Sequence, residues 1–457
     1  MSYSQPLWVR ENGTYPLSQF VERGISHREI YEVSQTAVAP LSFGPDRSVN
    51  VNFVGATSVA GIPIYSLPKF VPTVDTAHGV EILRAMINAI AKASTHAVHR
   101  LDSDSPLDDV EEQTSWLRTA YNLVEDFIAH GRYVSRHAVY VPHGEGEIDW
   151  EETITRSPVV LQRGRPIYTS PVSIDKRLHV NTDIARIHIA VIAELVARLD
   201  SMDPLGVIDI VRVPVHSDRE LSHFGDAATL LRIIQTERQQ QFEDRKLRVL
   251  DLLESYIFAR FDPHVASHST FVGTTHFEIV WETMCAAYFQ DRFRTLQKRL
   301  TPPLWEYRHK ESTVRVSASK SLIPDTVMVE GDALYVLDSK YYVPRYAAAS
   351  ISAQPGATDI AKQYMYVPGV EEKWPGKRVR GNAFVLPAPD LTADPIRSRG
   401  RVTLPFLGSS CHLPITLLEV NPLVLARNFL SDKTVPAGAI QRFFAPAGTT
   451  KEPLGLS

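Results

Sequence analysis

The chain has 457 residues, of which 44% are hydrophobic and 22% are charged, and this composition excludes a disordered protein. Its length predicts two or three domains. The formal net charge of −4 argues against a surface coated with basic residues, although a local basic stripe can still bind nucleic acid.

The N-terminal part of the chain is predicted to be rich in β-strands. Residues 51–70, VNFVGATSVAGIPIYSLPKF, combine β-branched and aromatic residues with turn-forming glycines. The first residues, MSYSQPLWVREN, lack the charged and apolar regions of a secretory signal. We therefore expect residues 1–75 to form a β-rich segment.

The central part, residues 76–255, is predicted to be mostly helical. From about His78, apolar residues recur at the spacing of one helix face, and the spacing returns after an acidic loop expected at 101–113. A third helix is expected at 183–199 and a long, mixed-charge helix at 228–258. The apolar positions of the first two helices are Val80, Leu83, Ile87, Ile90, Trp116, Ala120, Leu123 and Phe127.

The chain is expected to be cytoplasmic and to have no membrane segment. Its most apolar helical stretch, residues 187–199, is too short to span a bilayer and contains His188 and Glu194. The two cysteines, Cys285 and Cys411, provide no disulfide framework, which suits a reducing compartment.

The C-terminal part, residues 256–457, is predicted to be an α/β domain that follows a connection at 261–276. Helix, three strands, helix and strand in this order are typical of an α/β sandwich. The whole chain is therefore predicted to be a multidomain α/β protein. The elements expected in this domain are a helix at 276–300, strands at 312–319, 323–330 and 333–343, a helix at 358–366, a strand at 382–387, and a strand and helix at 415–430.

Acidic and basic residues of this domain stand where a metal-dependent active site would use them. Glu278 and Glu282 lie four residues apart, and hence on one helix face. Asp325 begins one strand, and Asp338 and Lys340 end the next strand on a common face. The alternative is an edge strand that ends in a solvated salt bridge.

The chemistry of phosphodiester cleavage explains why these residue types belong together. One or two Mg²⁺ ions neutralise the phosphate, activate a water and stabilise the leaving oxygen. Mg²⁺ usually binds one or two carboxylates. Asp325 and Asp338 can converge on one ion with Glu282, for which Glu278 is the substitute, and Lys340 can orient the attacking water or stabilise negative charge.

These residues resemble the PD-(D/E)xK nuclease superfamily. Its PD element corresponds to Pro324-Asp325 and its DxK element to Asp338-Ser339-Lys340. The resemblance implies that residues 256–457 form a nuclease core.

A closer resemblance is to the LlaJI-type restriction endonucleases, relatives of the McrC nuclease subunit. The sequences DSKYY at 338–342 and DIAKQYMY at 359–366 are similar to this family's pattern, and residues 53–70 and 146–154 also resemble it. The resemblance implies that Gln363 orients Lys340 or the attacking water.

The same resemblance implies a partner. The chain has no GxxxxGK[ST] nucleotide-binding motif, because GVEEKWPGKR at 369–378 has the wrong spacing. Members of the family work with a separate AAA+ GTPase, and the N-terminal part of McrC-type proteins inserts into that motor. Residues 76–255 are therefore predicted to dock onto a McrB-like AAA+ GTPase.

Basic residues that follow the predicted catalytic strands are candidates for contact with DNA. Loops beside an active site can position phosphate groups, and a contribution to solubility is the alternative. These residues are Lys373, Lys377, Arg378, Arg380, Arg397, Arg399 and Arg401.

The sequence thus predicts a Mg²⁺-dependent endonuclease that cuts double-stranded DNA into 5′-phosphate and 3′-hydroxyl ends. The resemblance makes it the cleavage subunit of an LlaJI/McrBC-like restriction system in phage defence. Two alternatives stay open. One is a stand-alone, site-specific restriction endonuclease in which residues 1–250 read the DNA, and the other is a non-catalytic subunit that stimulates a GTPase.

Overall fold

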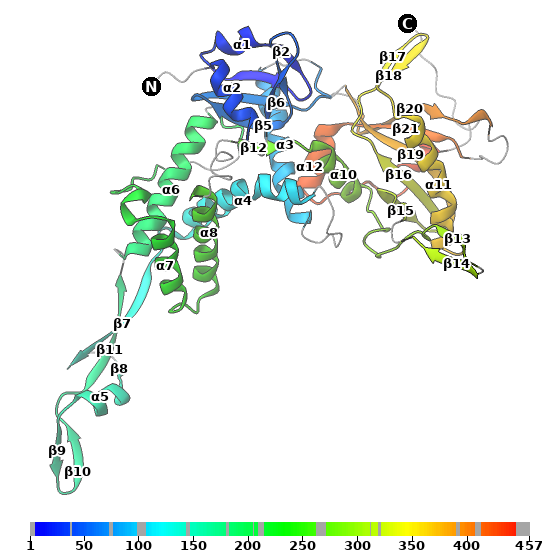
Figure 1. The fold of residues 1–457 in the computed structure, drawn as a ribbon. Helices are drawn as coiled ribbons and strands as arrows, with labels where there is room; N and C mark the ends of the chain where they lie inside the picture. The colour runs from blue at the N-terminus through cyan, green and yellow to red at the C-terminus, as the bar shows by residue number, and fades with distance from the viewer. Residues whose placement is uncertain are drawn as a thin grey trace. The chain divides into compact units, whose positions relative to one another are not determined.

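The structure is a computed structural model with a mixed α/β fold (Figure 1). It describes residues 5–36, 39–72, 76–97, 107–142, 147–179, 182–203, 205–208, 214–261, 271–310, 312–318, 321–389, 394–406 and 413–444. Contacts group the chain into a first unit of residues 1–115, 202–209 and 270–457 and a second unit of residues 116–201 and 210–269. The three predicted segments, residues 1–75, 76–255 and 256–457, remain a prediction.

Two small sheets form the N-terminal part of the first unit. One has the strand order β1 (Leu7–Arg10), β6 (Ile62–Leu67), β5 (Val54–Val59) and β12 (Phe271–Thr274), in which β1 and β6 are parallel. The other is antiparallel, with the order β2 (Thr14–Pro16), β4 (Ser48–Val51) and β3 (Leu41–Gly44). Strands expected within 51–70 are therefore present.

Two short helices, α1 (Leu17–Val21) and α2 (His27–Ser34), complete this part and were not predicted. Helix α2 begins with a capping box, in which Ser26 Oγ accepts from Glu29 N–H and the Glu29 carboxylate accepts from Ser26 N–H. The cap orients α2 so that Ile30 packs in the core with Phe53.

A pair of glycines allows β12 to join the first sheet. Gly273 lies opposite Gly55 of β5. A Cβ atom on Gly273 would lie 2.1 Å from the carbonyl oxygen of Val54, and one on Gly55 would lie 2.1 Å from that of Val272. Only glycine permits so close an approach of two backbones. Because β12 directly precedes helix α10 (Phe277–Tyr288), this pairing anchors the start of the C-terminal part.

Replacing Gly273 with alanine should lower the free energy of unfolding by about 1–3 kcal/mol, because the added Cβ would collide with backbone atoms that no rotamer change can move. Gly356→Ala adds a methyl group without a collision, since its φ is −78° and the nearest atom around its Cβ is 4.0 Å away, and as the N-cap of α11 it should lose no more than about 1 kcal/mol. Urea unfolding measures both variants. Wild-type stability of Gly273→Ala would contradict the assigned close contact.

Helix α3 (Thr76–Ala97) connects the N-terminal sheets to the C-terminal helices. It contacts β5, β6 and β12 and also α10 and α12 (Pro422–Leu430). Its buried positions include Leu83, Ile87 and Ile90, as the apolar spacing predicted. At its other face, Lys92 Nζ lies 2.6 Å from Asp432 Oδ1. The helix expected from His78 is confirmed.

The C-terminal part is built on a five-stranded mixed sheet. Its order is β15 (Thr326–Glu330), β16 (Ala333–Ser339), β19 (Arg378–Pro387), β21 (Ile415–Val420) and β20 (Ile396–Val402). Strands β16, β19 and β21 are parallel, and the outer strands run antiparallel to their neighbours. Strands β16 and β21 are buried along their whole length, as in parallel sheets covered on both faces.

Helices cover this sheet, with α11 (Ala357–Lys373) on one side and α10 and α12 on the other (Figure 1). On the α11 side, Leu334 and Val336 of β16 pack with Tyr366 and Val370 of α11. On the other side, Trp281 Nε1 of α10 donates to the carbonyl oxygen of Val385, at 3.4 Å. The predicted α/β sandwich is confirmed.

Two hairpins project from this part without joining the five-stranded sheet. One pairs β13 (Leu304–His309) with β14 (Ser312–Ser317), and the other pairs β17 (Arg345–Ala347) with β18 (Ser350–Ser352). Strand β13 was not predicted, and the strand expected at 312–319 corresponds to β14, with residues 319 and 320 outside the described part. The last element is the 3₁₀ helix η4 (Gln441–Phe443).

The second unit contains a cluster of helices. They are α4 (Leu107–His130) from residue 116 onward, α6 (Asp183–Met202), α7 (Ala227–Arg238), α8 (Asp244–Phe261) and the 3₁₀ helix η1 (Leu221–Phe224). Asp126 of α4 accepts two hydrogen bonds from the Arg245 guanidinium of α8, at 2.9 and 2.8 Å. Glu194 of α6 accepts from Tyr256 and Arg260 of α8, at 2.9 and 2.7 Å. Charged hydrogen bonds therefore tie α8 to both neighbours.

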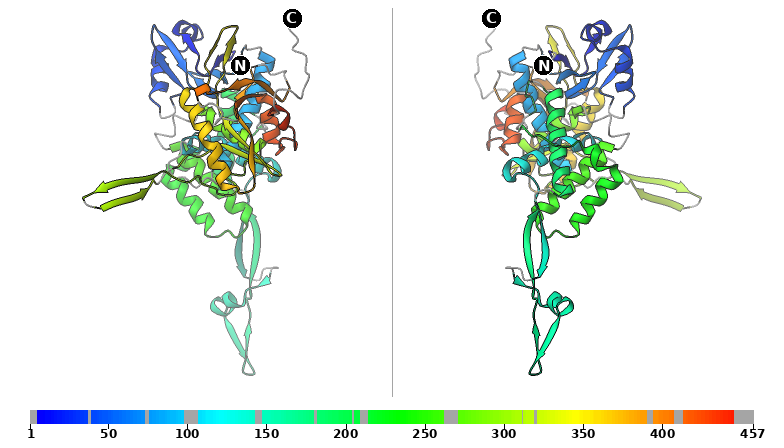
Figure 2. Two further views of the ribbon diagram at one scale, coloured as in Figure 1. Left: turned by 90° about the vertical axis from the view of Figure 1, so that its right-hand side faces the viewer. Right: turned by 90° about the vertical axis from the view of Figure 1, so that its left-hand side faces the viewer.

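An arm extends from the helices of this unit (Figures 1 and 2). Strands β7 (Ser135–Pro142) and β11 (Val172–His179) form its antiparallel ribbon, and β8 (Glu147–Ile148) pairs with β11. Helix α5 (Trp150–Arg156) and the hairpin of β9 (Val159–Gln162) and β10 (Arg165–Tyr168) form the tip.

Two expected helices in the middle of the chain have different bounds. The helix expected at 228–258 is divided into α7 and α8, and Arg238 at the end of α7 pairs with Asp251 and Glu254 of α8, at 2.7 and 2.5 Å. The loop expected at 101–113 is already helical from Leu107, and residues 101–106 lie outside the described part.

The helix expected at 276–300 ends at Tyr288. The reason is Asp291, whose carboxylate accepts from the backbone N–H of Phe293, Arg294 and Val327 and so favours a turn over a helix. Of the connection expected at 261–276, residues 262–270 lie outside the described part, and β12 begins at residue 271.

The strands near the predicted site also differ in their ends. The strand expected at 323–330 begins at Thr326, because the preceding Pro324 has no N–H for the ladder. The strand expected at 333–343 ends at Ser339, and the one expected at 382–387 begins at Arg378. The helix expected at 358–366 continues to Lys373. Among the helices of the described ranges, none has the length and apolar character needed to cross a membrane.

Candidate active site

The pairing of β15 with β16 brings two predicted ligands together. Thr326 pairs with Leu337, so the preceding Asp325 lies opposite Asp338. Asp325 Oδ2 accepts a hydrogen bond from the backbone N–H of Ser339, at 2.9 Å. A two-residue turn closes the hairpin, with Gly331 at φ +59°. Hairpin geometry therefore fixes the position of Asp325 beside Asp338.

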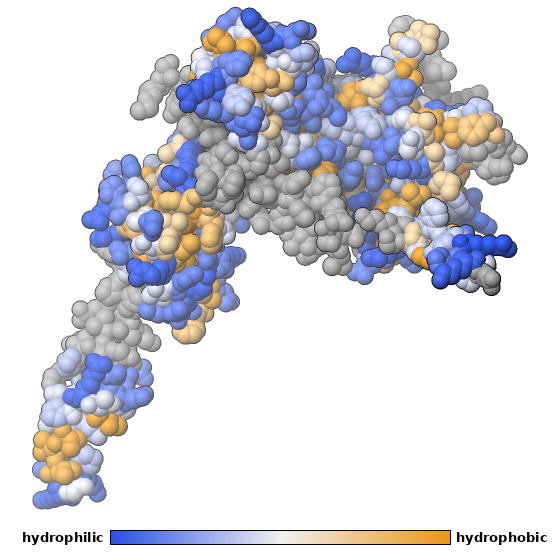
Figure 3. Space-filling view, in the orientation of Figure 1, coloured by the Kyte–Doolittle hydropathy of each residue, from blue (hydrophilic) through white to orange (hydrophobic). Residues whose placement is uncertain are grey.

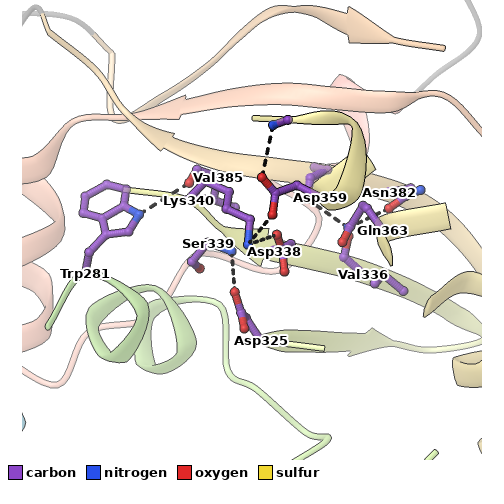
Figure 4. Close-up of polar contacts among 12 residues, drawn as sticks. Trp281, Asp325, Val336, Asp338, Ser339, Lys340, Asp359, Gln363, Asn382 and Val385 are labelled. Atoms are coloured by element: carbon purple, nitrogen blue, oxygen red, sulfur yellow. Dashed lines mark hydrogen bonds and ion pairs between the residues drawn. The ribbon is translucent and has the colours of Figure 1, made fainter. Parts of the chain in front are cut away.

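Lys340 joins these acids just after β16 ends (Figure 4). Its Nζ lies 2.8 Å from Asp338 Oδ2 and 3.7 Å from Asp359 Oδ1, at the start of α11. The Lys340 backbone N–H donates to the carbonyl oxygen of Val385 on β19, at 2.9 Å. Lys340 is thus held from both its main chain and its side chain.

The site concentrates negative charge in a buried place. Burial, followed by the charges of Asp338 and Glu282, raises the pKa of Asp325 well above its usual value. Burial by itself would lower the pKa of Lys340, but Asp338 outweighs it and the pKa is raised. Lys340 therefore remains an ammonium ion.

The two glutamates of α10 lie in different surroundings. Glu282 is half-buried, and its charge acts on Asp325. Glu278 is exposed, and its Oε1 lies 3.1 Å from His276 Nδ1. Glu282 is therefore the better candidate of the two for the group around Asp325.

Gln363 of α11 is fully buried but does not bind the acidic group in the described contacts. Its Nε2 donates to Asn382 Oδ1 at 2.7 Å, and to the carbonyl oxygens of Val336 and Ala383, each at 3.2 Å (Figure 4). These contacts join α11 to β16 and β19 two residues before Asp338. Gln363 can thus position the strand, and its predicted contact with Lys340 stays a prediction.

Sequence reasoning missed two side chains beside these residues. Asp359, in the quoted DIAKQYMY, binds Lys340, and Arg294 Nη2 lies 3.8 Å from Asp325 Oδ1. Tyr366, which the sequence suggests as a packing residue around the site, is buried, and its pKa is raised first by burial and then by the charges of Asp338 and Asp325. Arg294 gave no signal, because it was placed inside a predicted helix.

A second buried group ties the site to the N-terminal sheets. Tyr341 Oη, one residue after Lys340, donates to Glu11 Oε2 at 2.5 Å. The Lys69 ammonium lies 4.0 Å from the centre of the Tyr341 ring. Burial raises the pKa of Glu11, and the bond to Tyr341 opposes this rise. The chain just after β16 is therefore anchored to the N-terminal part of the first unit as well as to the C-terminal sheet.

The predicted DNA-contacting basic residues are largely engaged in the protein. Arg397 and Arg399 lie on β20, not on a loop, and their guanidinium groups approach Glu419 to 2.8 and 4.0 Å. Arg378 lies on β19 and pairs with Glu371, at 3.4 Å. The Lys377 ammonium group donates to the Gly331 carbonyl oxygen. The side chains of Arg380 and Arg401 are exposed to solvent. Their contact with DNA stays a prediction.

The carboxylates of the candidate site resemble the ligands that Mg²⁺ usually binds. Within the described residues, no three histidine, cysteine, aspartate or glutamate side chains are close enough to hold a metal by themselves. Mg²⁺ usually takes one or two carboxylates and completes its shell with water and phosphate oxygens. Asp325 and Asp338 supply such a pair, and a cation would relieve the repulsion that raises the Asp325 pKa. The residues fit this ion.

Replacing Asp325 with asparagine should raise the free energy of unfolding of the metal-free protein at neutral pH. The pKa of Asp325 is raised in the folded state, so each unit of that rise costs about 1.4 kcal/mol at a pH above it. The cost disappears as the pH falls through the raised pKa toward the unfolded value. The advantage of Asp325→Asn should therefore shrink on acidification.

Thermal unfolding of both proteins in a chelator, from about pH 8 down to about pH 4, measures this difference. Asp332→Asn, on the exposed hairpin turn, is the control for removal of a solvated carboxylate. If Asp325→Asn is less stable than wild type throughout, the bond to Ser339 outweighs the repulsion and the electrostatic argument is wrong.

Comparison with known proteins adds the following findings. The model of the LlaJI restriction endonuclease family matches residues 53–426. The chain is 23% identical over 421 residues to the "Type II restriction enzyme BsuMI component YdjA" of Bacillus subtilis (strain 168), covering 88% of this chain and 85% of that protein. The family match includes every residue of the candidate site from Glu278 to Gln363.

Solved structures show weaker likenesses. A half-complex of Thermococcus gammatolerans McrB AAA+ hexamers with bound McrC has a TM-score of 0.38 at 12% identity, over 94% of this chain and 99% of that chain. The cryo-EM structure of the McrBC complex of the same organism has a TM-score of 0.26 at 13% identity, over 57% of this chain and 87% of that chain.

Proposed function

Because the chain belongs to the LlaJI restriction endonuclease family, we propose that it is a Mg²⁺-dependent endonuclease that cuts double-stranded DNA. The observation that carries the proposal is the convergence of Asp325 and Asp338 with the Lys340 ammonium, at the ends of two paired strands. A solvated strand-end salt bridge would not explain it, because Asp338 is only 4% exposed and Asp325 is crowded by like charge.

Asp325 and Asp338 would hold the metal, and the predicted third ligand, Glu282 from α10, would add negative charge beside them. Held there, the ion would supply charge neutralisation for the phosphate and would acidify the attacking water. Glu278 is the poorer candidate, because its carboxylate pairs with His276.

Lys340 supplies the fixed positive charge. Its ammonium group donates to Asp338 and retains further N–H donors for the attacking water or a phosphate oxygen. Attack of water on phosphorus would displace the 3′ oxygen and leave 5′-phosphate and 3′-hydroxyl ends. Gln363 would act through the strands, because its amide holds the carbonyl groups of β16 and β19.

Replacing Asp338 with asparagine should reduce cleavage of duplex DNA at least about 100-fold, since it removes a metal ligand and the partner of Lys340. Asp332→Asn is the matched control, because this aspartate lies on the exposed turn of the same hairpin. Gel assays of DNA cleavage in Mg²⁺ measure both. Wild-type cleavage by Asp338→Asn would favour a non-catalytic subunit or a different active site.

We also propose that the chain works with an AAA+ GTPase. The Bacillus subtilis relative is described as a component of a restriction enzyme, which implies further components. The tip of the arm carries an exposed apolar patch, visible in Figure 3, in which Leu161 is 71% and Trp150 is 58% exposed. Other exposed members of the patch are Ile148, Ile154, Val159, Val160 and Ile167. Apolar patches of this kind mark protein interfaces.

Replacing Leu161 with aspartate should weaken binding to the AAA+ GTPase of the same restriction system about tenfold or more, because a charge would enter an apolar interface. Arg163→Ala, in the turn of the same hairpin, is the control. Pull-down and GTP-dependent cleavage measure the effect. Unchanged binding by Leu161→Asp would contradict this docking site, and cleavage without any GTPase would favour a stand-alone enzyme.

A further inference from the structure

The β13–β14 ribbon is inserted between two segments of the candidate active site. It lies between Arg294 and Asp325, which the fold brings to within 3.8 Å of each other. The ribbon is therefore an insertion between two residues of the candidate site. Its base lies at the C-terminal end of α11, where Ser321 Oγ donates to the Thr301 carbonyl oxygen and Thr301 Oγ1 donates to Glu372. Figure 2 shows it projecting from the α/β part of its own unit. Its two strands pair only with each other.

One face of this ribbon is apolar and aromatic. Cross-strand partners share a face, so Trp305 and Tyr307 lie on the same side as their partners Val316 and Val314. Trp305 is 66% and Tyr307 is 50% exposed. Every residue of the two strands is exposed except Val314. An isolated hairpin with such a face is marginally stable in water, which indicates that a partner covers it.

The end of the ribbon is basic. The strands are joined at His309 and Ser312, and Lys310 stands in the turn between them, at φ +54°. Arg308 precedes the turn and is exposed, whereas Arg315 is engaged with Glu306, at 2.6 Å. Arg308 and Lys310 thus place positive charge at the tip, although Arg308 shares a face with its partner Thr313 and not with the aromatic rings. A polyanion complements this pattern better than an apolar protein surface does.

We infer that the β13–β14 ribbon is a DNA-binding arm. This inference rests on the proposed function, because it takes duplex DNA as the substrate. The major groove of B-form DNA admits a two-stranded β-ribbon. Trp305 and Tyr307 contact sugars and bases with their exposed rings, and Arg308 and Lys310 bind phosphate groups.

The test measures DNA binding separately from cleavage. All arm variants are made in the Asp338→Asn background and titrated with a duplex oligonucleotide in a chelator. Trp305→Ala with Tyr307→Ala should weaken binding about tenfold or more. Thr313→Ala with Ser317→Ala, on the opposite face of the same ribbon, should bind like the parent. Arg308→Ala with Lys310→Ala should reduce the slope of log K against log salt by about 2.

Several outcomes separate this inference from the proposed function. Wild-type cleavage by Asp338→Asn would defeat the proposed function, whatever the arm does. Full binding by both arm variants would overturn the inference and leave the active site standing. Loss of self-association or of GTPase binding, with DNA binding intact, would assign the aromatic face to protein contact and would also overturn it. Thermal unfolding should match the parent in each variant, because the replaced side chains are exposed.

Discussion

The proposed nuclease activity depends on two carboxylates held against their mutual repulsion at the ends of paired strands. Asp325 and Asp338 meet because the register of one hairpin sets them opposite each other, and because Ser339 N–H binds Asp325. Burial prevents water from screening their charges, so the pKa of Asp325 is raised. A site of this kind gains stability when a cation enters, and Lys340 supplies only one fixed positive charge. Metal binding would relieve the repulsion between these two carboxylates.

The sequence predicted the elements with strong periodicity and missed those created by long-range packing. Helix α3 and strand β16 follow from their apolar patterns. Helix α10 ends early because the Asp291 carboxylate binds backbone N–H groups, one of them on β15, and no local pattern reveals that contact. Strand β12 pairs with β5 from more than 200 residues away in the sequence. Only the two facing glycines, Gly55 and Gly273, could have indicated that pairing.

The residues of the candidate site that belong to the sequence motif were predictable. Asp325, Asp338 and Lys340 come together because adjacent strands carry them, and spacing along strands is readable from sequence. The sequence already favoured Glu282 over Glu278. In the structure the Glu282 charge acts on Asp325, whereas Glu278 is exposed and pairs with His276. Arg294 was not predictable, because an irregular turn carries it to Asp325.

The most direct test of the central claim is calorimetric titration of Mg²⁺ into the wild-type protein and into Asp325→Asn/Asp338→Asn. Buffers with different ionisation enthalpies report the protons released. The account predicts that the wild type binds Mg²⁺ and releases protons near and below the raised pKa of Asp325, whereas the double variant does neither. Equal Mg²⁺ binding by both proteins would show that these carboxylates are not the metal site.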